Sequence, residues 1–233
     1  MTTMTGEKIK ELAMRIEQSD QKFIWVLRDV DKGDIFVGEV KREKLPEGFE
    51  ERVKEVGMVV RDWAPQVEIL GHLSTSGFMS HCGWNSRFKS LTMGVPIAAW
   101  PMHSDQPKNA FLVTNTLKVG MVANTWELRE EIVTSSTIAK VVKKLIASKE
   151  GEEIKKRAEE LASRVFSEGV EAAATTTSNS PIFSPSPVPH LLLSSLPRCF
   201  SETKRLPSLG GASISACPSP IMNLGICDGG WGC

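Results

Sequence analysis

Apolar residues along the first 171 positions follow two alternating spacings, which predict helices and strands in turn. Ile9, Leu12, Ala13 and Ile16 recur at helical spacing, so residues 7–17 are expected to form a helix. The compact apolar run Phe23–Leu27 is typical of a buried strand. The same criteria predict strands at 57–61, 77–81, 95–100 and 119–123, and helices at 47–55, 66–70, 83–93 and 105–116, followed by two helices with apolar faces built on Ile138 and Ile154. The alternation predicts an α/β fold, with a Rossmann-like parallel sheet and helices on both of its faces.

Both spacings end near Ala172. Eight of the 13 prolines lie after residue 180, mixed with Ser, Thr and Gly. Such a composition cannot bury enough apolar surface to fold, so residues 174–233 are expected to be largely disordered. The expected organisation is one domain over residues 1–171 and a Ser/Pro-rich tail of low complexity over residues 172–233.

Charge and cysteine usage exclude several classes of function. Lys plus Arg and Asp plus Glu both number 28, so the formal charge of zero argues against a general nucleic-acid binder. The first twenty residues carry no apolar secretory run, and no segment is apolar for long enough to cross a bilayer, so we expect a cytoplasmic protein. No C-x-x-C pair and no Cys/His spacing of a zinc site occurs, and we expect no metal.

The hexapeptide His81-Cys-Gly-Trp-Asn-Ser86 carries the first candidate chemistry. A strand is expected to end at His81, and a helix to begin around Trp84 after a glycine turn. The first turn of a helix has unpaired N–H groups and partial positive charge, which favour a diphosphate. Asn85, Ser86 and His81 add side-chain donors there. The alternative is an ordinary strand-end histidine followed by an Asn/Ser helix cap.

Side chains on both flanks extend this site. Trp63 follows a predicted strand and can stack on a base, while the Gln66 amide can pair with a donor and an acceptor on its edge. Asp105 and Gln106 follow the fourth predicted strand and suit the vicinal hydroxyls of a sugar. The alternatives are a core tryptophan and a helix N-cap at Asp105. Together these residues predict a nucleotide-sugar pocket.

The order and spacing of these motifs resemble the signature box of plant UDP-glycosyltransferases. The residues that carry the resemblance are Trp63-Ala-Pro-Gln66, His72, Gly77-Phe78, His81-Cys-Gly-Trp-Asn-Ser86, Gly94-Val-Pro96, Trp100-Pro101 and Asp105-Gln106. Residues 6–166 as a whole resemble the C-terminal domain of that family, and zeatin O-glucosyltransferases and O-xylosyltransferases in particular.

The resemblance implies a fold, a reaction and a set of roles. The fold is the C-terminal half of a GT-B enzyme, and the reaction transfers a sugar with inversion from UDP-glucose or UDP-xylose to a cytokinin-like or phenolic hydroxyl, with no cofactor or metal. The implied roles are uracil binding by Trp63, Gln66 and the backbone of Ala64, diphosphate binding by His81, Asn85 and Ser86, and sugar binding by Trp84, Asp105 and Gln106.

The chain departs from the family pattern in three ways. The family places its general base, a His oriented by an Asp, in an N-terminal domain, so no catalytic residue is assigned here. The first strand of the C-terminal domain is also missing, which predicts a sheet with one strand fewer and an unpaired edge. Lys89 stands where the family has a glutamate that accepts from both ribose hydroxyls.

These departures predict weak binding of UDP-sugar and little or no turnover by the chain alone. The alternatives are a non-catalytic nucleotide-sugar-binding or regulatory module, and a fragment without a role. A dehydrogenase is disfavoured because the chain contains no G-x-G-x-x-G.

Overall fold

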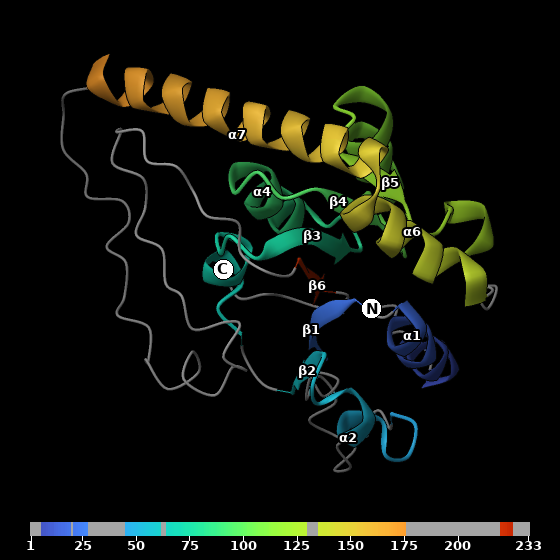
Figure 1. Cartoon of the computed structure of the whole chain (residues 1–233). Helices are drawn as coiled ribbons and strands as arrows, with labels where there is room; N and C mark the ends of the chain where they lie inside the picture. Colours follow the sequence, from blue (N-terminus) through green and yellow to red (C-terminus); the bar gives the residue numbers. More distant parts are fainter. Residues whose placement is uncertain are drawn as a thin grey trace, which may run out of the picture.

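A parallel six-stranded sheet forms the centre of the protein (Figure 1). The computed structural model describes residues 6–19, 21–27, 45–61, 64–129, 135–175 and 220–225. The strands are β1 (Lys22–Val26), β2 (Gly57–Val60), β3 (Thr75–Ser80), β4 (Ile97–Ala99), β5 (Gly120–Val122) and β6 (Ile221–Gly225). Their order in the sheet is β2-β1-β6-β3-β4-β5, and all the pairs are parallel. This architecture confirms the predicted fold class.

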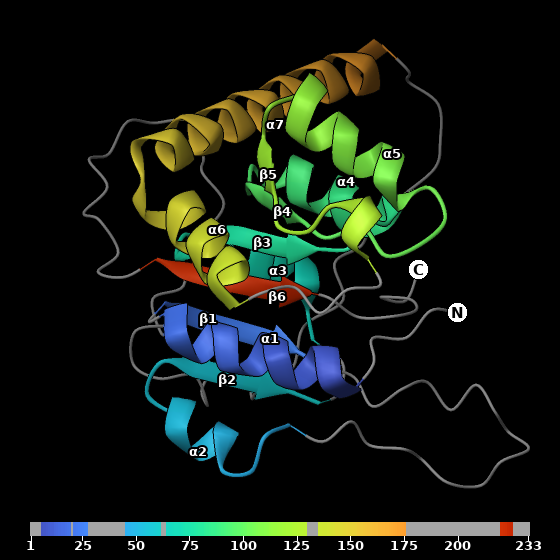
Figure 2. The ribbon, with the colours of Figure 1, turned by 90° about the vertical axis from the view of Figure 1, so that its right-hand side faces the viewer.

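The tail contributes the third strand of this order, which corrects two predictions. Residues 221–225 were expected to be disordered, and the sheet was expected to lack a strand, yet β6 lies between β1 and β3 and pairs with both (Figure 2). The short run Ile-Met-Asn-Leu is too brief for a clear sequence signal. Its strand conformation comes from the two neighbouring strands, which satisfy its backbone and bury its apolar side chains.

Helices cover both faces of the sheet. On one face α1 (Gly6–Ser19), α2 (Phe49–Val53) and α6 (Ser135–Ala147) bury their apolar sides, and α1 and α6 lie next to each other (Figure 2). The other face is covered by α3 (Gln66–Leu70), α4 (Trp84–Thr92) and α5 (Gln106–Phe111), with part of α7 (Lys149–Thr175). Side chains that alternate along each strand therefore enter two separate layers of core.

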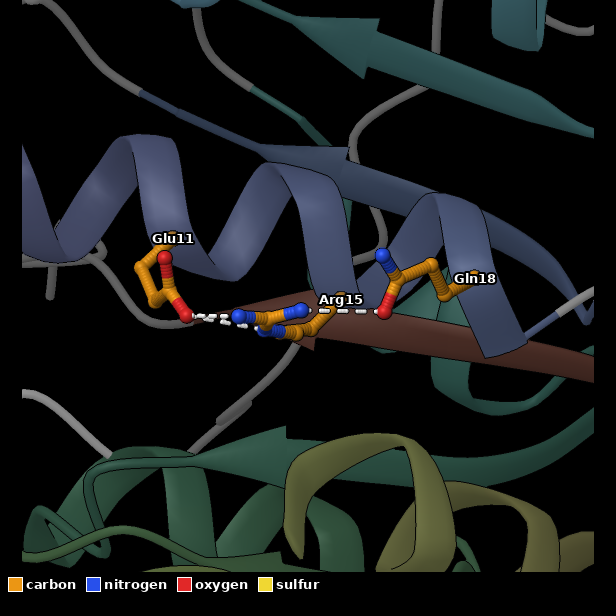
Figure 3. Close-up of polar contacts among 3 residues, drawn as sticks. All are labelled: Glu11, Arg15 and Gln18. Carbon is orange, nitrogen blue, oxygen red and sulfur yellow. Dashed lines mark hydrogen bonds and ion pairs between the residues drawn. The ribbon is translucent and has the colours of Figure 1, made fainter. Parts of the chain in front are cut away.

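The helix α1 confirms the helix that apolar spacing predicted over residues 7–17. Ile9, Leu12, Ala13 and Ile16 are all buried. On another side of the same helix, Arg15 contacts Glu11 one turn earlier, and its Nη1 donates to Gln18 Oε1 at 3.0 Å (Figure 3). Such pairs stabilise a helix by only a few tenths of a kcal/mol, so burial of the apolar side positions α1.

Most predicted elements agree with the structure to within a few residues. The fourth strand is shorter than predicted, because Pro96 precedes it without an N–H to donate, although its carbonyl accepts from Phe78 N at 2.9 Å. The helix predicted over 105–116 is α5 followed by a wider π-helical turn, Leu112–Thr116. A short 3₁₀ turn, Trp126–Leu128, was not predicted.

The helix α7 ends at Thr175, a few residues past the domain boundary predicted at residue 171. The rest of the predicted disorder, over residues 176–219 and 226–233, lies outside the described residues. None of the helices in the described ranges is long and apolar enough to span a membrane.

Candidate functional site

The predicted site residues that the structure describes lie along one edge of the sheet. In a parallel sheet the carboxyl ends of all strands lie at the same edge. His81 follows β3 at this edge, and the segment that leads to α5 follows β4 there. The strand order runs from β1 to β2 on one side of β6, and from β3 through β4 to β5 on the other. Ligands of open α/β sheets bind at such a reversal of strand order.

The loop after β3 brings the backbone into an unusual conformation. Cys82 has a φ of 63°, in the left-handed region, although it is not a glycine. Its N–H donates to Ser80 Oγ at 3.1 Å, which helps to hold this turn. At the next residue a Cβ on Gly83 would lie 2.5 Å from His81 Nε2, so the close approach of the ring requires glycine. The Gly83 turn therefore sets where the His81 ring lies.

Burial keeps the His81 ring neutral. Desolvation is the largest cause that lowers the pKa of His81 to about 4; His103 lowers it further and the Asp105 charge opposes this. The buried Nδ1 of His81 has no hydrogen-bond partner in the described part of the chain. A neutral imidazole carries one N–H and one acceptor nitrogen, so His81 can donate a single hydrogen bond to a ligand oxygen.

The helix α4 begins directly after the loop that carries His81. Gly83 is its N-cap residue, and no side-chain cap hydrogen bond forms there among the described residues. Trp84 is 63% exposed, Asn85 is exposed and Ser86 is buried. A helix start favours an anion, because its first N–H groups have no partner within the helix. The structure confirms the helix start that the hexapeptide predicted.

Gln66 lies at the start of α3 with its side-chain amide buried and unsatisfied. The residue is 3% exposed, and neither Oε1 nor Nε2 has a hydrogen-bond partner among the described residues. The preceding Ala64 is also buried. Trp63 lies outside the described residues. A buried amide with two unmet hydrogen bonds is costly, which indicates that Gln66 is positioned for a ligand with both a donor and an acceptor.

Asp105 and Gln106 differ in how many of their side-chain hydrogen-bonding groups are still available to a ligand. Asp105 is exposed, and its Oδ2 accepts from Asn109 Nδ2 at 2.9 Å. Gln106 is 3% exposed, and its Oε1 accepts from the N–H groups of Met102 at 2.8 Å and His103 at 3.0 Å. Gln106 therefore holds the loop after β4 with its carbonyl oxygen, and only its Nε2, which lies 3.3 Å from His103 Nε2, remains as a donor.

Asn109 is a positioning residue that the motif analysis missed. Its Nδ2 donates to the carbonyl of Cys82 at 3.0 Å and to Asp105 Oδ2 at 2.9 Å, so it ties α5 to the loop before α4. The signal was present in the sequence, since an Asn four residues after an Asp on a helix lies on the same face.

Arg87 and Lys89 add positive charge to α4. Arg87 is 5% exposed, and its guanidinium carbon lies 4.6 Å from the centre of the Trp84 ring. Its Nε is buried without a partner, and in the described part of the chain it forms no ion pair with a carboxylate. Lys89 is half-buried two residues further on. A buried cation near a helix start is unfavourable without an anion. Lys89 was among the site residues predicted from the sequence, and Arg87 was not.

Comparisons with known proteins show the family of this chain. The family model described as "UDP-glucoronosyl and UDP-glucosyl transferase" matches residues 1–164. The chain is 63% identical over 161 residues to zeatin O-xylosyltransferase of Phaseolus vulgaris, and 61% identical over 158 residues to zeatin O-glucosyltransferase of Phaseolus lunatus. These matches cover 69% and 67% of this chain, but 36% and 34% of the two relatives, so the chain spans about a third of their length.

Solved structures show the same likeness. UGT2 of Phytolacca americana, complexed with UDP-2fluoro-glucose and pterostilbene, is 37% identical with a TM-score of 0.59, covering 69% of this chain and 34% of that one. A transferase from Siraitia grosvenorii in complex with UDP is 38% identical with a TM-score of 0.59, covering 70% and 35%. With a family model that matches most of the chain, this protein belongs to the family of UDP-glucuronosyl and UDP-glucosyl transferases.

Proposed function

We propose that this chain binds a UDP-sugar and forms the donor-binding half of an inverting glycosyltransferase site. The uracil lies against Gln66 and the Ala64 backbone, with Trp63 stacked on its face. The diphosphate lies at the start of α4, with His81, Asn85 and Ser86 as side-chain donors. Trp84, Asp105 and the amide nitrogen of Gln106 face the sugar.

The observation that carries this proposal is the buried, unsatisfied amide of Gln66. Uracil offers an N–H beside a carbonyl, which matches both groups of the amide. Leaving them unmet costs roughly 1–3 kcal/mol per group, so a ligand that satisfies both gains this free energy on binding. The relatives solved with UDP or a UDP-sugar support this choice of ligand.

The start of α4 and His81 also favour departure of UDP. As the bond from sugar to diphosphate breaks, negative charge develops on the leaving oxygen, and the backbone N–H groups at the start of α4 stabilise it. His81 is neutral at physiological pH because burial lowers its pKa to about 4, so it stabilises the oxygen through its N–H without a formal charge. The base that deprotonates the acceptor hydroxyl is not assigned to this chain.

The names of two similar relatives indicate the substrates. Two relatives at 63% and 61% identity act on zeatin, one as an O-xylosyltransferase and one as an O-glucosyltransferase. We therefore propose UDP-xylose or UDP-glucose as donor and a cytokinin-like hydroxyl as acceptor. The donor site is the part for which this chain carries residues.

Titration calorimetry of the purified chain with UDP, UDP-glucose and UDP-xylose tests donor binding. We expect saturable heat with each, and weaker or no heat with ADP, because its base presents a different edge to Gln66. Sugar transfer to zeatin is measured in parallel. Binding without transfer identifies a nucleotide-sugar-binding module, while binding with transfer identifies a complete enzyme. A chain that melts cooperatively but binds no uridine nucleotide contradicts the proposal.

Lys89→Glu tests the ribose contact separately. A glutamate can accept hydrogen bonds from both ribose hydroxyls, whereas lysine has no acceptor. We expect UDP to bind about tenfold to hundredfold more tightly to the variant, which corresponds to about 1–3 kcal/mol. Lys89→Gln is the control for loss of the positive charge, and 2′-deoxy-UDP should lose most of the gain. Equal affinities for the glutamate and glutamine variants would show that residue 89 does not reach the ribose.

A further inference from the structure

The strand β6 occupies a slot between two halves of the sheet. On one side Phe23, Ile24 and Trp25 of β1 pair with Met222, Asn223 and Leu224, and on the other side Phe78 and Met79 of β3 pair with Asn223 and Leu224. Without β6, the edges of β1 and β3 would both have unpaired backbone groups. The slot therefore accepts an extended strand that runs parallel to both neighbours.

The walls of the slot fit apolar side chains on both faces of the sheet. Met222 and Leu224 enter the core layer under α1 and α6, and Ile221 enters the opposite layer beside Ile24 and Val26. Gly77 makes room for one of them, since a Cβ there would lie 2.8 Å from Met222 Sδ. The slot therefore selects a strand with uncharged, apolar side chains.

The resident strand does not match this slot well at its centre. Asn223 is completely buried between Ile24 and Phe78, and neither atom of its side-chain amide has a hydrogen-bond partner among the described residues. The register against β3 is also irregular, because Thr75 pairs with Ile221 and Gly77 pairs with Met222. An unsatisfied buried amide and a bulge both weaken the hold on β6.

Among the residues that the structure describes, side chains hold β6 in the sheet only through apolar packing. Of residues 220–225, only Asn223 carries a polar side chain, and that side chain is unpaired. The preceding helix ends at Thr175 and β6 begins at Ile221. The connection, residues 176–220, could extend to roughly 150 Å, so β6 can leave the slot without α7 moving.

We propose that the slot between β1 and β3 is an exchangeable strand-binding site, which the chain fills with its own residues 221–225. Its ligand is an extended, apolar peptide strand of another polypeptide, with a β-branched residue where the resident strand has Asn223. Such a strand adds the same backbone hydrogen bonds and removes the buried unpaired amide. Recognition follows the principle of strand addition, in which the backbone supplies affinity and alternating side chains supply selectivity.

The test uses the full chain and a fluorescent peptide that copies residues 219–225 with valine in place of the asparagine. Fluorescence anisotropy should show saturable binding to the unaltered chain. Binding of the peptide to the Asn223→Val chain should be weaker by on the order of tenfold. The β6 strand of that variant no longer contains a buried unpaired amide, so it competes better with the peptide. A control peptide with proline at the same position should not bind, since proline removes an N–H from the centre of the strand.

Hydrogen exchange read by mass spectrometry locates the bound peptide. In the complex, residues 221–225 should lose protection while β1 and β3 keep theirs. Absence of binding to the unaltered chain, equal binding to the chain and to Asn223→Val, or unchanged protection of residues 221–225 would each overturn the proposal. None of these readouts depends on a nucleotide, so they are independent of the proposed function.

Discussion

At the residue scale, two of the buried polar groups without partners among the described residues lie in the proposed donor site. Gln66 and His81 both have side-chain atoms that are buried and unpaired among the described residues. A folded protein tolerates such groups at a cost, and a binding site is a common reason to keep them. The two residues come from different segments, at the start of α3 and directly after β3, yet they lie at the same edge of the sheet.

Replacing Gln66 should separate stability from binding. Gln66→Met keeps the length of the side chain and removes two unsatisfied polar groups, so we expect the free energy of unfolding to rise by about 1 kcal/mol. UDP affinity should fall about tenfold, because the uracil edge loses its partners. Urea unfolding and calorimetry on the same preparation measure both quantities. A variant with lower stability and unchanged UDP affinity would show that the amide serves the fold.

The low pKa of His81 should appear in the pH dependence of stability. The unfolded chain takes up a proton near pH 6.5, whereas the folded chain does so only near pH 4. The unfolded state therefore binds more protons between these values, and the free energy of unfolding falls as the pH is lowered through this window.

For one group the slope is at most about 1.4 kcal/mol per pH unit. His81→Gln should remove this contribution, and urea unfolding at pH 7, 6, 5 and 4.5 measures it. His72→Gln is the matched control, because His72 lies outside the cluster of His81, His103 and Asp105. A slope that persists unchanged in His81→Gln would assign the titration to another group.

At the element scale, two connections place the site. Asn109 joins α5 to the loop before α4, and Gln106 holds the loop after β4. Neither residue needs to touch a ligand to matter, because each fixes the backbone that presents Asp105 and the start of α4. The strand β6 acts in a different way, since it joins the β1–β2 pair to the β3–β4–β5 group.

The contact of Gly77 with Met222 gives a direct test of the position of β6. Gly77→Ala adds a Cβ 2.8 Å from Met222 Sδ and 3.3 Å from Leu145 Cδ2, so we expect a loss of about 1–3 kcal/mol of stability. Adding Met222→Ala should relieve part of the clash. The double-mutant cycle should give a coupling of about 0.5 kcal/mol or more. Strict additivity would place residue 222 away from Gly77.

At the scale of the whole molecule, β6 makes the sheet a single unit. With β6 removed, the pair β1–β2 and the group β3–β4–β5 share no strand pairing. The remaining connection runs through helices, such as the packing of α1 on α6. Cooperativity of the domain therefore depends on a segment that lies far from the rest of the sheet in the sequence.

Truncation should reveal this dependence. We expect a chain that stops at residue 219 to lose its single cooperative thermal transition, because two strand edges become unpaired. A chain that stops at residue 226 keeps β6 and should retain the transition. Calorimetry and near-ultraviolet circular dichroism measure the difference. Equal cooperativity in the two chains would show that β6 is dispensable.

The amino-acid sequence was enough to predict the fold class, the family and the order of the elements other than β6 and the 3₁₀ turn. Periodicity located α1, β1 and α4, because their apolar residues repeat at the spacing of the structure that buries them. The motif from Gln66 to Gln106 predicted residues that the structure places along the carboxyl edge of the sheet, since each follows or opens an element at that edge.

The place of β6 and the burial and hydrogen bonding of individual side chains became evident only in the folded protein. Residues 221–225 have too short a pattern to specify a strand, and their conformation depends on β1 and β3, which lie about 150 or more positions earlier in the sequence. The neutral His81, the unpaired Gln66 and the engaged oxygen of Gln106 also depend on burial and on partners. Burial and hydrogen-bond partners cannot be derived from the sequence alone, because both arise when elements that are distant in the sequence pack together.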